Sequence, residues 1–158
     1  MKWKPTPRVK LFEAIGAVAD DRIKDIVTDG PIKTAKVYSS SGNKYYDISY
    51  DPETSAIMCN DNGSYWKGYL GYPAIAFLMK IGALSYDSKI GDMLKGVAWK
   101  DVNQKFDNDF EKAVESVLAD KSAEERTRIY QYVDSVYAEL CTREFSHLGT
   151  KNKPPSGY

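Results

Sequence analysis

Residues 33–50 read KTAKVYSSSGNKYYDISY, two runs rich in Tyr, Thr and β-branched residues on either side of a Ser-Gly-Asn turn. In the second run, Tyr46, Ile48 and Tyr50 alternate with their neighbours, a period typical of a strand with one buried face. Further turn signals, Asp-Pro-Glu and Asn-Asp-Asn-Gly, follow at intervals of about ten residues. The spacing predicts a four-strand antiparallel meander with strands at 34–40, 44–50, 56–60 and 64–70.

Helical patterns lie on both sides of this meander. Thr6 and Pro7 are typical of a helix start, and the apolar spacing predicts helix over 7–28, either continuous or broken near Asp20. After the meander, residues 73–84 contain a single charged residue. A helix that is apolar nearly all round belongs in the middle of a domain, so we expect it against the inner face of the sheet.

The C-terminal half repeats the helical period. Apolar residues at spacings of three and four predict helices within 87–97 and 106–120. Ser122 and Glu125 form a capping-box pattern, which predicts a helix of roughly six turns from that point. The element order therefore predicts an α+β fold: an N-terminal helix, a four-strand meander, then a helical C-terminal half packed on the sheet.

Composition and charge narrow the protein class. The chain has 158 residues with 22 basic and 22 acidic side chains, so we expect one domain over 1–148 and a disordered tail over 149–158. Zero net charge disfavours a protein that gathers nucleic acid by long-range attraction. The N-terminus lacks the apolar core of a signal peptide, and no run reaches the ~20 apolar residues of a membrane span. Two free cysteines fit a reducing cytoplasm.

Four segments together resemble the SWIM zinc-finger module: KVYSSSGNKYY at 36–46, YDPET at 50–54, CND at 59–61 and PAIAFL at 73–78. That family combines a V-x-S-S-S-G hairpin, a C-x-C-P-D strand end and a C-K-H-I-x-A-x-L helix start. Cys59 matches the second cysteine of C-x-C, but Ile57 stands at the first, and neither Cys nor His occurs between Cys59 and Leu84.

The resemblance thus implies a version without metal, stabilised by its sheet and buried helix, with DNA or protein binding as the associated role. No zinc ligand carries over. Two cysteines and one histidine cannot complete a four-ligand Cys/His zinc site, so we expect no cofactor and no stoichiometric zinc.

The stretch YWKGYLGY at 65–72 is a candidate binding surface. Aromatic residues alternating along a strand edge beside a lysine can stack bases or hold a partner. The alternative is that half of them face the core. The candidate residues here are Tyr65, Trp66, Lys67 and Tyr69, with Lys44 of the neighbouring hairpin.

The first ten residues are a second candidate surface. Lys2, Lys4, Arg8 and Lys10 surround Trp3 with no acidic residue among them. Such an arm could bind phosphates or an acidic protein surface, and of it we assign Lys4, Arg8 and Lys10 to the binding site. The alternative is a solvated, mobile terminus, in which case removing residues 1–5 and 150–158 leaves the fold intact.

Catalytic motifs are not found: the sequence has no G-x-S-x-G, P-loop, G-x-G-x-x-G or H-E-x-x-H pattern. We therefore assign no catalytic residue. We expect His147 at the C-terminal end of the last helix and Cys141 buried on its apolar stripe. The sequence leaves open whether Cys59 and His147 meet.

The leading hypothesis is a non-enzymatic interaction domain that binds a protein partner or nucleic acid through the aromatic and basic surface. In its nucleic-acid form, binding is expected to be weak, salt-dependent and sequence-tolerant. The alternative is a small enzyme or small-molecule-binding protein with a tyrosine-lined pocket between the sheet and the C-terminal helices.

Overall fold

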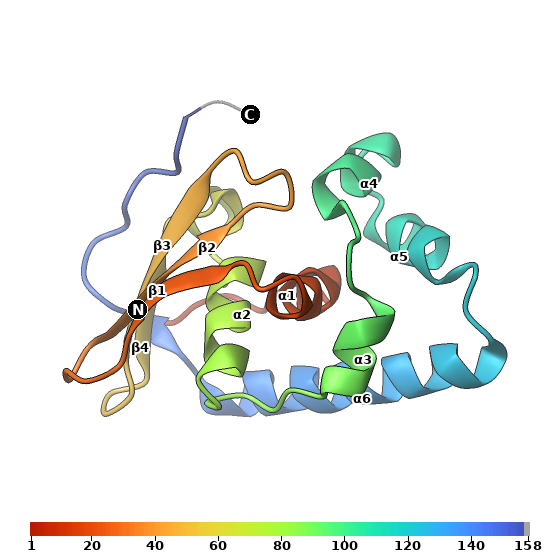
Figure 1. Ribbon diagram of the computed structural model, residues 1–158. Coiled ribbons are helices and arrows are strands. Elements are labelled where there is room, and N and C mark those ends of the chain that lie inside the picture. The colour runs from red at the N-terminus through yellow and green to blue at the C-terminus, as the bar shows by residue number, and fades with distance from the viewer. Residues whose placement is uncertain (157–158) are drawn as a thin grey trace.

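A computed structural model describes residues 1–156 and confirms the α+β class (Figure 1). Within those residues the sheet has five strands: β1 (Ile23–Val27), β2 (Lys33–Tyr38), β3 (Tyr45–Asp51), β4 (Ala56–Cys59) and β5 (Ser146–His147). The helices are α1 (Val9–Ala19), α2 (Tyr72–Lys80), α3 (Ser88–Met93), α4 (Trp99–Lys105), α5 (Phe110–Leu118) and α6 (Ala123–Arg143). A π-helical turn, η1 (Gly63–Lys67), follows β4.

The strands lie side by side in chain order, from β1 to β5. The first four pair antiparallel, as a meander of short connections requires, and β2 and β3 pair in register from Lys33 opposite Tyr50 to Tyr38 opposite Tyr45. The last strand, β5, is parallel to β4. The long helix α6 returns the chain to the β4 edge of the sheet, and β5 follows that helix.

The core lies between the sheet and the helices. The apolar helix α2 contacts strands β1 to β4, as predicted, and buries seven of its nine residues. Helix α1 packs on α2 and is itself contacted by α3, α5 and α6 (Figure 1). The inward residues of β3 are Tyr46, Ile48 and Tyr50, the alternating set read from the sequence. Among the described residues, every helix is too short or too polar to cross a lipid bilayer.

The second half of the predicted helix 7–28 is wrong, because residues 23–27 form the edge strand β1. Helix α1 ends at Ala19, and Asp21 adopts a left-handed φ of 55°, which turns the chain out of the helix. The β-branched residues that follow favour extended backbone. Only Ile23 of β1 is buried, so its apolar residues reflect strand pairing rather than a helical stripe.

The fourth predicted strand, 64–70, is also wrong, because its first half is the turn η1. The Asp61 carboxylate accepts hydrogen bonds from the Ser64 backbone N–H at 3.3 Å and from its hydroxyl at 2.5 Å. The Tyr65 N–H donates to the Asp61 carbonyl. These bonds start a helical turn, and Gly68, at a φ of 80°, ends it. The alternating aromatic residues in the sequence do not indicate that these hydrogen bonds form.

At the C-terminus, both hydrogen bonds of the Ser122–Glu125 capping box are present, which confirms the predicted start of α6. The helix ends at Arg143, and Glu144 adopts a left-handed φ of 49°. His147 therefore lies in β5 rather than at a helix end, and Cys141 is exposed rather than buried. Both expectations were wrong.

Part of the predicted tail lies beside the sheet. Lys151 Nζ donates to the Tyr65 carbonyl, and the Asn60 side chain donates to the Lys153 carbonyl, each at 3.4 Å. Disorder of residues 149–158 stays a prediction, and residues 157–158 lie outside the described residues.

Candidate functional site

The structure separates the predicted binding residues into three places. The first is η1 and its surroundings, which we call the aromatic turn: Tyr65, Trp66 and Lys67, with Lys4 alongside. Tyr65 and Trp66 pack edge to face with ring centroids 4.6 Å apart, and Trp66 is 70% exposed. The Lys4 backbone N–H donates to the Gly68 carbonyl, which fixes the arm against this turn. Tyr69 is only half-exposed, and burial raises the pKa of its hydroxyl.

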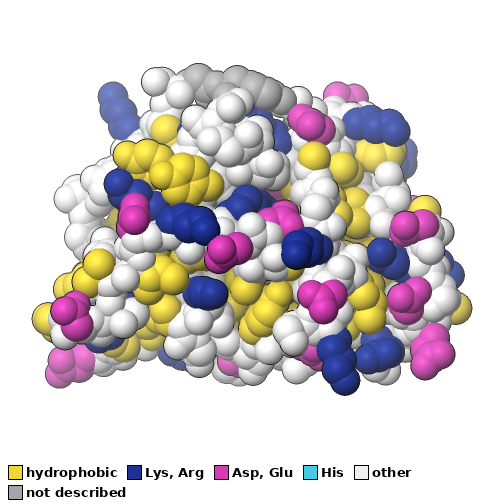
Figure 2. All heavy atoms as spheres, viewed as in Figure 1, with side chains coloured by type: hydrophobic (Ala, Val, Ile, Leu, Met, Phe, Trp, Pro, Cys, Tyr) yellow, Lys and Arg dark blue, Asp and Glu magenta, His cyan; other side chains and the backbone are white. Residues whose placement is uncertain are grey.

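Arg8 and Lys10 do not join that surface. Arg8 pairs with Asp134 of α6 and lies 4.9 Å from the centre of the Tyr130 ring. Lys10 points into the interior, where its ammonium lies 3.1 Å from Glu13 Oε2. Carboxylates of α6 and α1 thus pair with two charges of the basic arm, and the assignment of Lys4, Arg8 and Lys10 to a binding site stays a prediction. On the face shown in Figure 2, basic and acidic side chains are interspersed.

Lys44 belongs to the third place, at the tip of the β2–β3 hairpin. There the hairpin, α1, the start of α2 and helix α4 enclose a cavity of about 280 Å³, which we call the α1–α4 pocket. The residues that line it are Lys10, Glu13, Arg22, Ser39, Ser40, Asn62, Tyr72, Trp99, Lys100, Asn103, Gln104 and Asn108. Apart from Lys10, none of these belongs to the predicted binding set.

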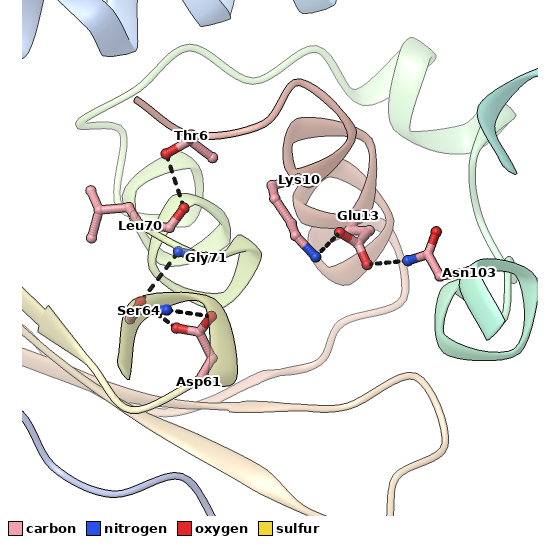
Figure 3. Close-up of polar contacts among 8 residues, drawn as sticks. All are labelled: Thr6, Lys10, Glu13, Asp61, Ser64, Leu70, Gly71 and Asn103. Carbon is pink, nitrogen blue, oxygen red and sulfur yellow. Dashed lines mark hydrogen bonds and ion pairs between the residues drawn. The ribbon is translucent and has the colours of Figure 1, made fainter. Parts of the chain in front are cut away.

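Glu13 lies at one wall of this pocket and is only 5% exposed. Its Oε1 accepts a 2.9 Å hydrogen bond from the Asn103 amide of α4, and its Oε2 is held by the ion pair with Lys10 (Figure 3). Burial opposes the charge of Lys10, but Glu13, with smaller contributions from Tyr69 and Asp61, outweighs it, so the pKa of Lys10 is raised. Lys10 is therefore charged at neutral pH.

Helix α4 reaches this wall because α1 carries a glycine one turn further on. The Trp99 indole lies against Gly16, where an added Cβ would come within 3.1 Å of Trp99 Nε1. Trp99 and Asn103 are four residues apart, so they share the face of α4 that meets Gly16 and Glu13. The close approach of α4 to α1 at Gly16 therefore also places Asn103 against Glu13.

Arg22 lies on another wall. One of its terminal nitrogens donates to the Tyr38 carbonyl at 2.9 Å, while its Nε is 3.7 Å from an Asp20 oxygen. The guanidinium also lies 5.8 Å from the ring centre of Tyr72, whose hydroxyl pKa is raised by burial.

Buried polar atoms of the pocket residues that lack a hydrogen-bond partner in the described part of the chain include Glu13 Oε2, which Lys10 meets as an ion pair, Arg22 Nε, Trp99 Nε1 and Asn103 Oδ1. Buried polar groups are normally satisfied, and each unsatisfied one costs about 1–3 kcal/mol. Trp99 Nε1 and Asn103 Oδ1 are thus a donor and an acceptor on α4 that no described residue satisfies. The arrangement suits recognition of a small polar ligand.

A separate polar cluster supports η1. Asp61 is buried beside the thiol of Cys59, whose pKa is raised well above its ordinary value by burial and then by Asp61. His147 instead stacks on Trp3, with ring centroids 3.8 Å apart, so the cysteine and the histidine have different neighbours. Within residues 1–156, no group of three or more His, Cys, Asp or Glu side chains could hold a metal ion.

Sequence reasoning missed Glu13, Arg22, Trp99 and Asn103. A local signal existed for Glu13, the single acidic residue in an otherwise apolar helix, and for the four-residue spacing of Trp99 and Asn103. Nothing local links the two helices, since Glu13 and Asn103 are 90 residues apart in the chain.

One family model matches this chain over residues 3–146, described as Uncharacterised conserved protein UCP014422. The match includes all the helices, the aromatic turn and every residue that lines the α1–α4 pocket. Neither the curated proteins nor the solved structures contain a match.

Proposed function

The chain belongs to the uncharacterised conserved protein family UCP014422, and we propose that it is a small-molecule-binding protein whose ligand occupies the α1–α4 pocket. The observation that carries this proposal is the set of unsatisfied buried atoms on α4, Trp99 Nε1 and Asn103 Oδ1. A ligand that accepts from the indole and donates to the amide recovers the cost of burying them.

The size of the pocket supports a small ligand. Its volume of about 280 Å³ is close to the lower end of the ~300–1,000 Å³ typical of small-molecule sites. The pocket differs from the tyrosine-lined one considered from sequence, because Tyr72 is its sole tyrosine and most of its described lining is charged or amide-bearing. Direct hydrogen bonds rather than apolar contact therefore supply its selectivity.

The Trp99 indole N–H is a direct reporter for this proposal. In a two-dimensional ¹H–¹⁵N spectrum, substituting each tryptophan by Phe assigns the three indole peaks. Titration with a library of neutral and charged polar compounds, each of about fifteen non-hydrogen atoms or fewer to suit the pocket volume, should move the Trp99 peak. The Trp66 peak, on the aromatic turn, is the internal control and should stay in place.

Asn103→Leu tests the same contact from the acceptor side. It should abolish the Trp99 response to every compound that produced one, while thermal denaturation shows a folded protein. The proposal fails if no compound moves the Trp99 peak, or if Asn103→Leu leaves all the responses unchanged.

A second candidate, partner binding through the aromatic turn, is favoured by the 70% exposure of Trp66. Lys4, Lys67 and Lys151 lie near it, so three phosphate contacts give a log–log salt slope of about −2 for single strands. Trp66 fluorescence should then quench on titration with single-stranded DNA at about 50 mM salt, and Trp66→Ala should abolish the quenching. An unchanged signal excludes the nucleic-acid form and leaves a protein partner.

A further inference from the structure

We propose that the α1–α4 pocket selects a ligand that carries a hydroxyl group, and that the buried ion pair of Lys10 and Glu13 imposes this selection through Asn103. This inference rests on the proposed ligand-binding function and adds to it the chemical class of the ligand. Glu13 is then a positioning residue, because it acts on the ligand through the Asn103 amide.

The side-chain amide of Asn103 has a fixed orientation. Its nitrogen donates to Glu13 Oε1 at 2.9 Å, and its oxygen points away from Glu13 (Figure 3). A carboxylate only accepts hydrogen bonds, so an amide turned the other way would place its oxygen against an oxygen of Glu13. Asn103 therefore offers the ligand an acceptor, Oδ1, rather than its NH₂ group.

Glu13 is held in turn by Lys10. The Lys10 ammonium lies 3.1 Å from Glu13 Oε2, and the two side chains are only 16% and 7% exposed. The ion pair occupies the second carboxylate oxygen, so Oε1 is the oxygen that meets Asn103. Lys10, Glu13 and Asn103 thus form a buried chain of contacts that fixes Asn103 Oδ1 as its unsatisfied end.

The Trp99 indole supplies the complementary donor. Trp99 is 2% exposed and Asn103 is 6% exposed, and neither Trp99 Nε1 nor Asn103 Oδ1 has a hydrogen-bond partner within residues 1–156. The two residues lie about one helical turn apart on the face of α4 that meets α1. A hydroxyl oxygen can accept one hydrogen bond and donate another, so a single hydroxyl group between them satisfies both.

Groups that only accept hydrogen bonds do not fit this arrangement. A ketone, ether or carboxylate oxygen can accept from the Trp99 indole, but it has no proton to share with the Asn103 oxygen. That oxygen then stays buried and unsatisfied, which weakens binding. Ser40, Asn62 and Asn108 also line the pocket and carry hydroxyl and amide groups that can bond further hydroxyls. The ligand class is therefore a small alcohol or polyol.

Cyclohexanol and cyclohexanone are matched probes, because they share a ring and differ in whether their oxygen can donate. Each is titrated into the full chain, with the Trp99 indole peak as the readout. We expect the ketone to require at least about tenfold more than the alcohol for the same shift. Equal concentrations of the two probes, or a peak that neither probe moves, overturn the hydroxyl assignment. The pocket itself still stands in those cases if other library compounds move the peak, whereas a peak that no compound moves rejects both proposals.

A double variant tests the positioning role of Glu13. Lys10→Met combined with Glu13→Gln removes both charges of the buried pair together, so neither is left without its partner. The new amide can donate or accept, so Asn103 can meet it in either orientation and can offer its NH₂ group to a ketone. The preference for the alcohol over the ketone should therefore fall from about tenfold to below about threefold.

Lys24→Met combined with Asp21→Asn is the matched control, because it removes an exposed ion pair with the same three-residue spacing. It should keep the full preference for the alcohol. A Lys10→Met, Glu13→Gln variant that is folded by thermal denaturation and keeps that preference overturns the positioning role of Glu13. If this double variant does not fold, Glu13→Gln alone is measured in the same way, with the same two outcomes.

Discussion

Gly71 lies where a side chain would collide with a buried carboxylate. A Cβ added there would come within 1.8 Å of an oxygen of Asp61. Asp61 cannot retreat easily, because it holds Ser64, whose hydroxyl in turn accepts from the Gly71 N–H at 3.3 Å (Figure 3). The absence of a side chain at residue 71 is therefore a requirement of packing.

We predict that Gly71→Ala lowers the free energy of unfolding by about 1–3 kcal/mol, the cost of overpacking. Gly30→Ala is the matched control, because its nearest neighbour would be 3.9 Å away. Urea denaturation of both variants measures the difference. Equal stability of the two variants would contradict the packing argument.

The two cysteines differ in environment, which predicts different reactivity. Cys59 is buried and its pKa is raised, so little thiolate forms near neutral pH, whereas Cys141 is exposed. At pH 8 a thiol reagent should label one equivalent of the folded chain quickly and the second after unfolding. Cys141→Ser should remove the fast equivalent. Two fast equivalents in the native protein would show that Cys59 is accessible.

At the scale of elements, the start of α6 depends on its cap. Ser122 Oγ accepts from the Glu125 N–H at 3.1 Å, and Glu125 Oε1 accepts from the Ser122 N–H at 3.0 Å. These bonds to Ser122 lower the pKa of Glu125. The ionised form of Glu125 is therefore the form that the two hydrogen bonds of the capping box stabilise.

Ser122→Ala should lower the free energy of unfolding by about 1 kcal/mol, the usual cost of losing an N-cap. Ser135→Ala, on the exposed side of the same helix, should change it by less than about 0.5 kcal/mol. The two are compared by chemical denaturation. A Ser122→Ala variant as stable as Ser135→Ala would mean that tertiary packing alone fixes this helix end.

The edge strand β1 has features that hinder pairing with a strand of another molecule. Ile26 and Val27 are partly exposed at the free edge of the sheet. Asp25 adopts a φ of 53°, and the register with β2 shifts between Lys24 and Val27. A bulge and a charge at an edge disrupt the regular row of backbone groups that another strand would need.

At the scale of the whole molecule, the N-terminal arm packs against strand β4 and against the segment that follows α6. Trp3 Nε1 donates to the Ile57 carbonyl at 3.1 Å, the Trp3 backbone N–H donates to the Phe145 carbonyl at 3.2 Å, and its ring stacks on His147. The arm is thus anchored to β4 and to the segment that follows α6, instead of being a solvated terminus.

We therefore reverse the expectation that residues 1–5 are dispensable. Removing them, or Trp3→Ala alone, should lower the melting temperature by at least ~5 °C, roughly 1–2 kcal/mol for a chain of this size. Lys2→Ala, which loses an exposed ion pair with Glu144, should have little effect. A deletion variant that melts with the full chain would restore the original expectation.

Local patterns were sufficient for much of the fold. The alternation of Tyr46, Ile48 and Tyr50, the apolar run of α2 and the Ser122 capping box all depend on residues within a few positions of one another, and each was confirmed. The errors at 23–27 and 64–70 arose where side chains ended or began a helical turn. The left-handed backbone of Asp21 and the hydrogen bonds between Asp61 and Ser64 determine where these turns begin and end. Hydrophobic periodicity gives no information about either feature.

The sequence therefore determined the class of the fold, the buried helix and the capped start of α6, because secondary structure and its caps follow from short-range periodicity. Tertiary structure decided the candidate site. Glu13 meets Asn103 only after α4 packs on α1. Tertiary structure also decided which charges of the basic arm are paired, because Asp134 and Glu13 meet Arg8 and Lys10 once the helices are assembled. Charge pairing depends on distance in space, which residue order does not specify.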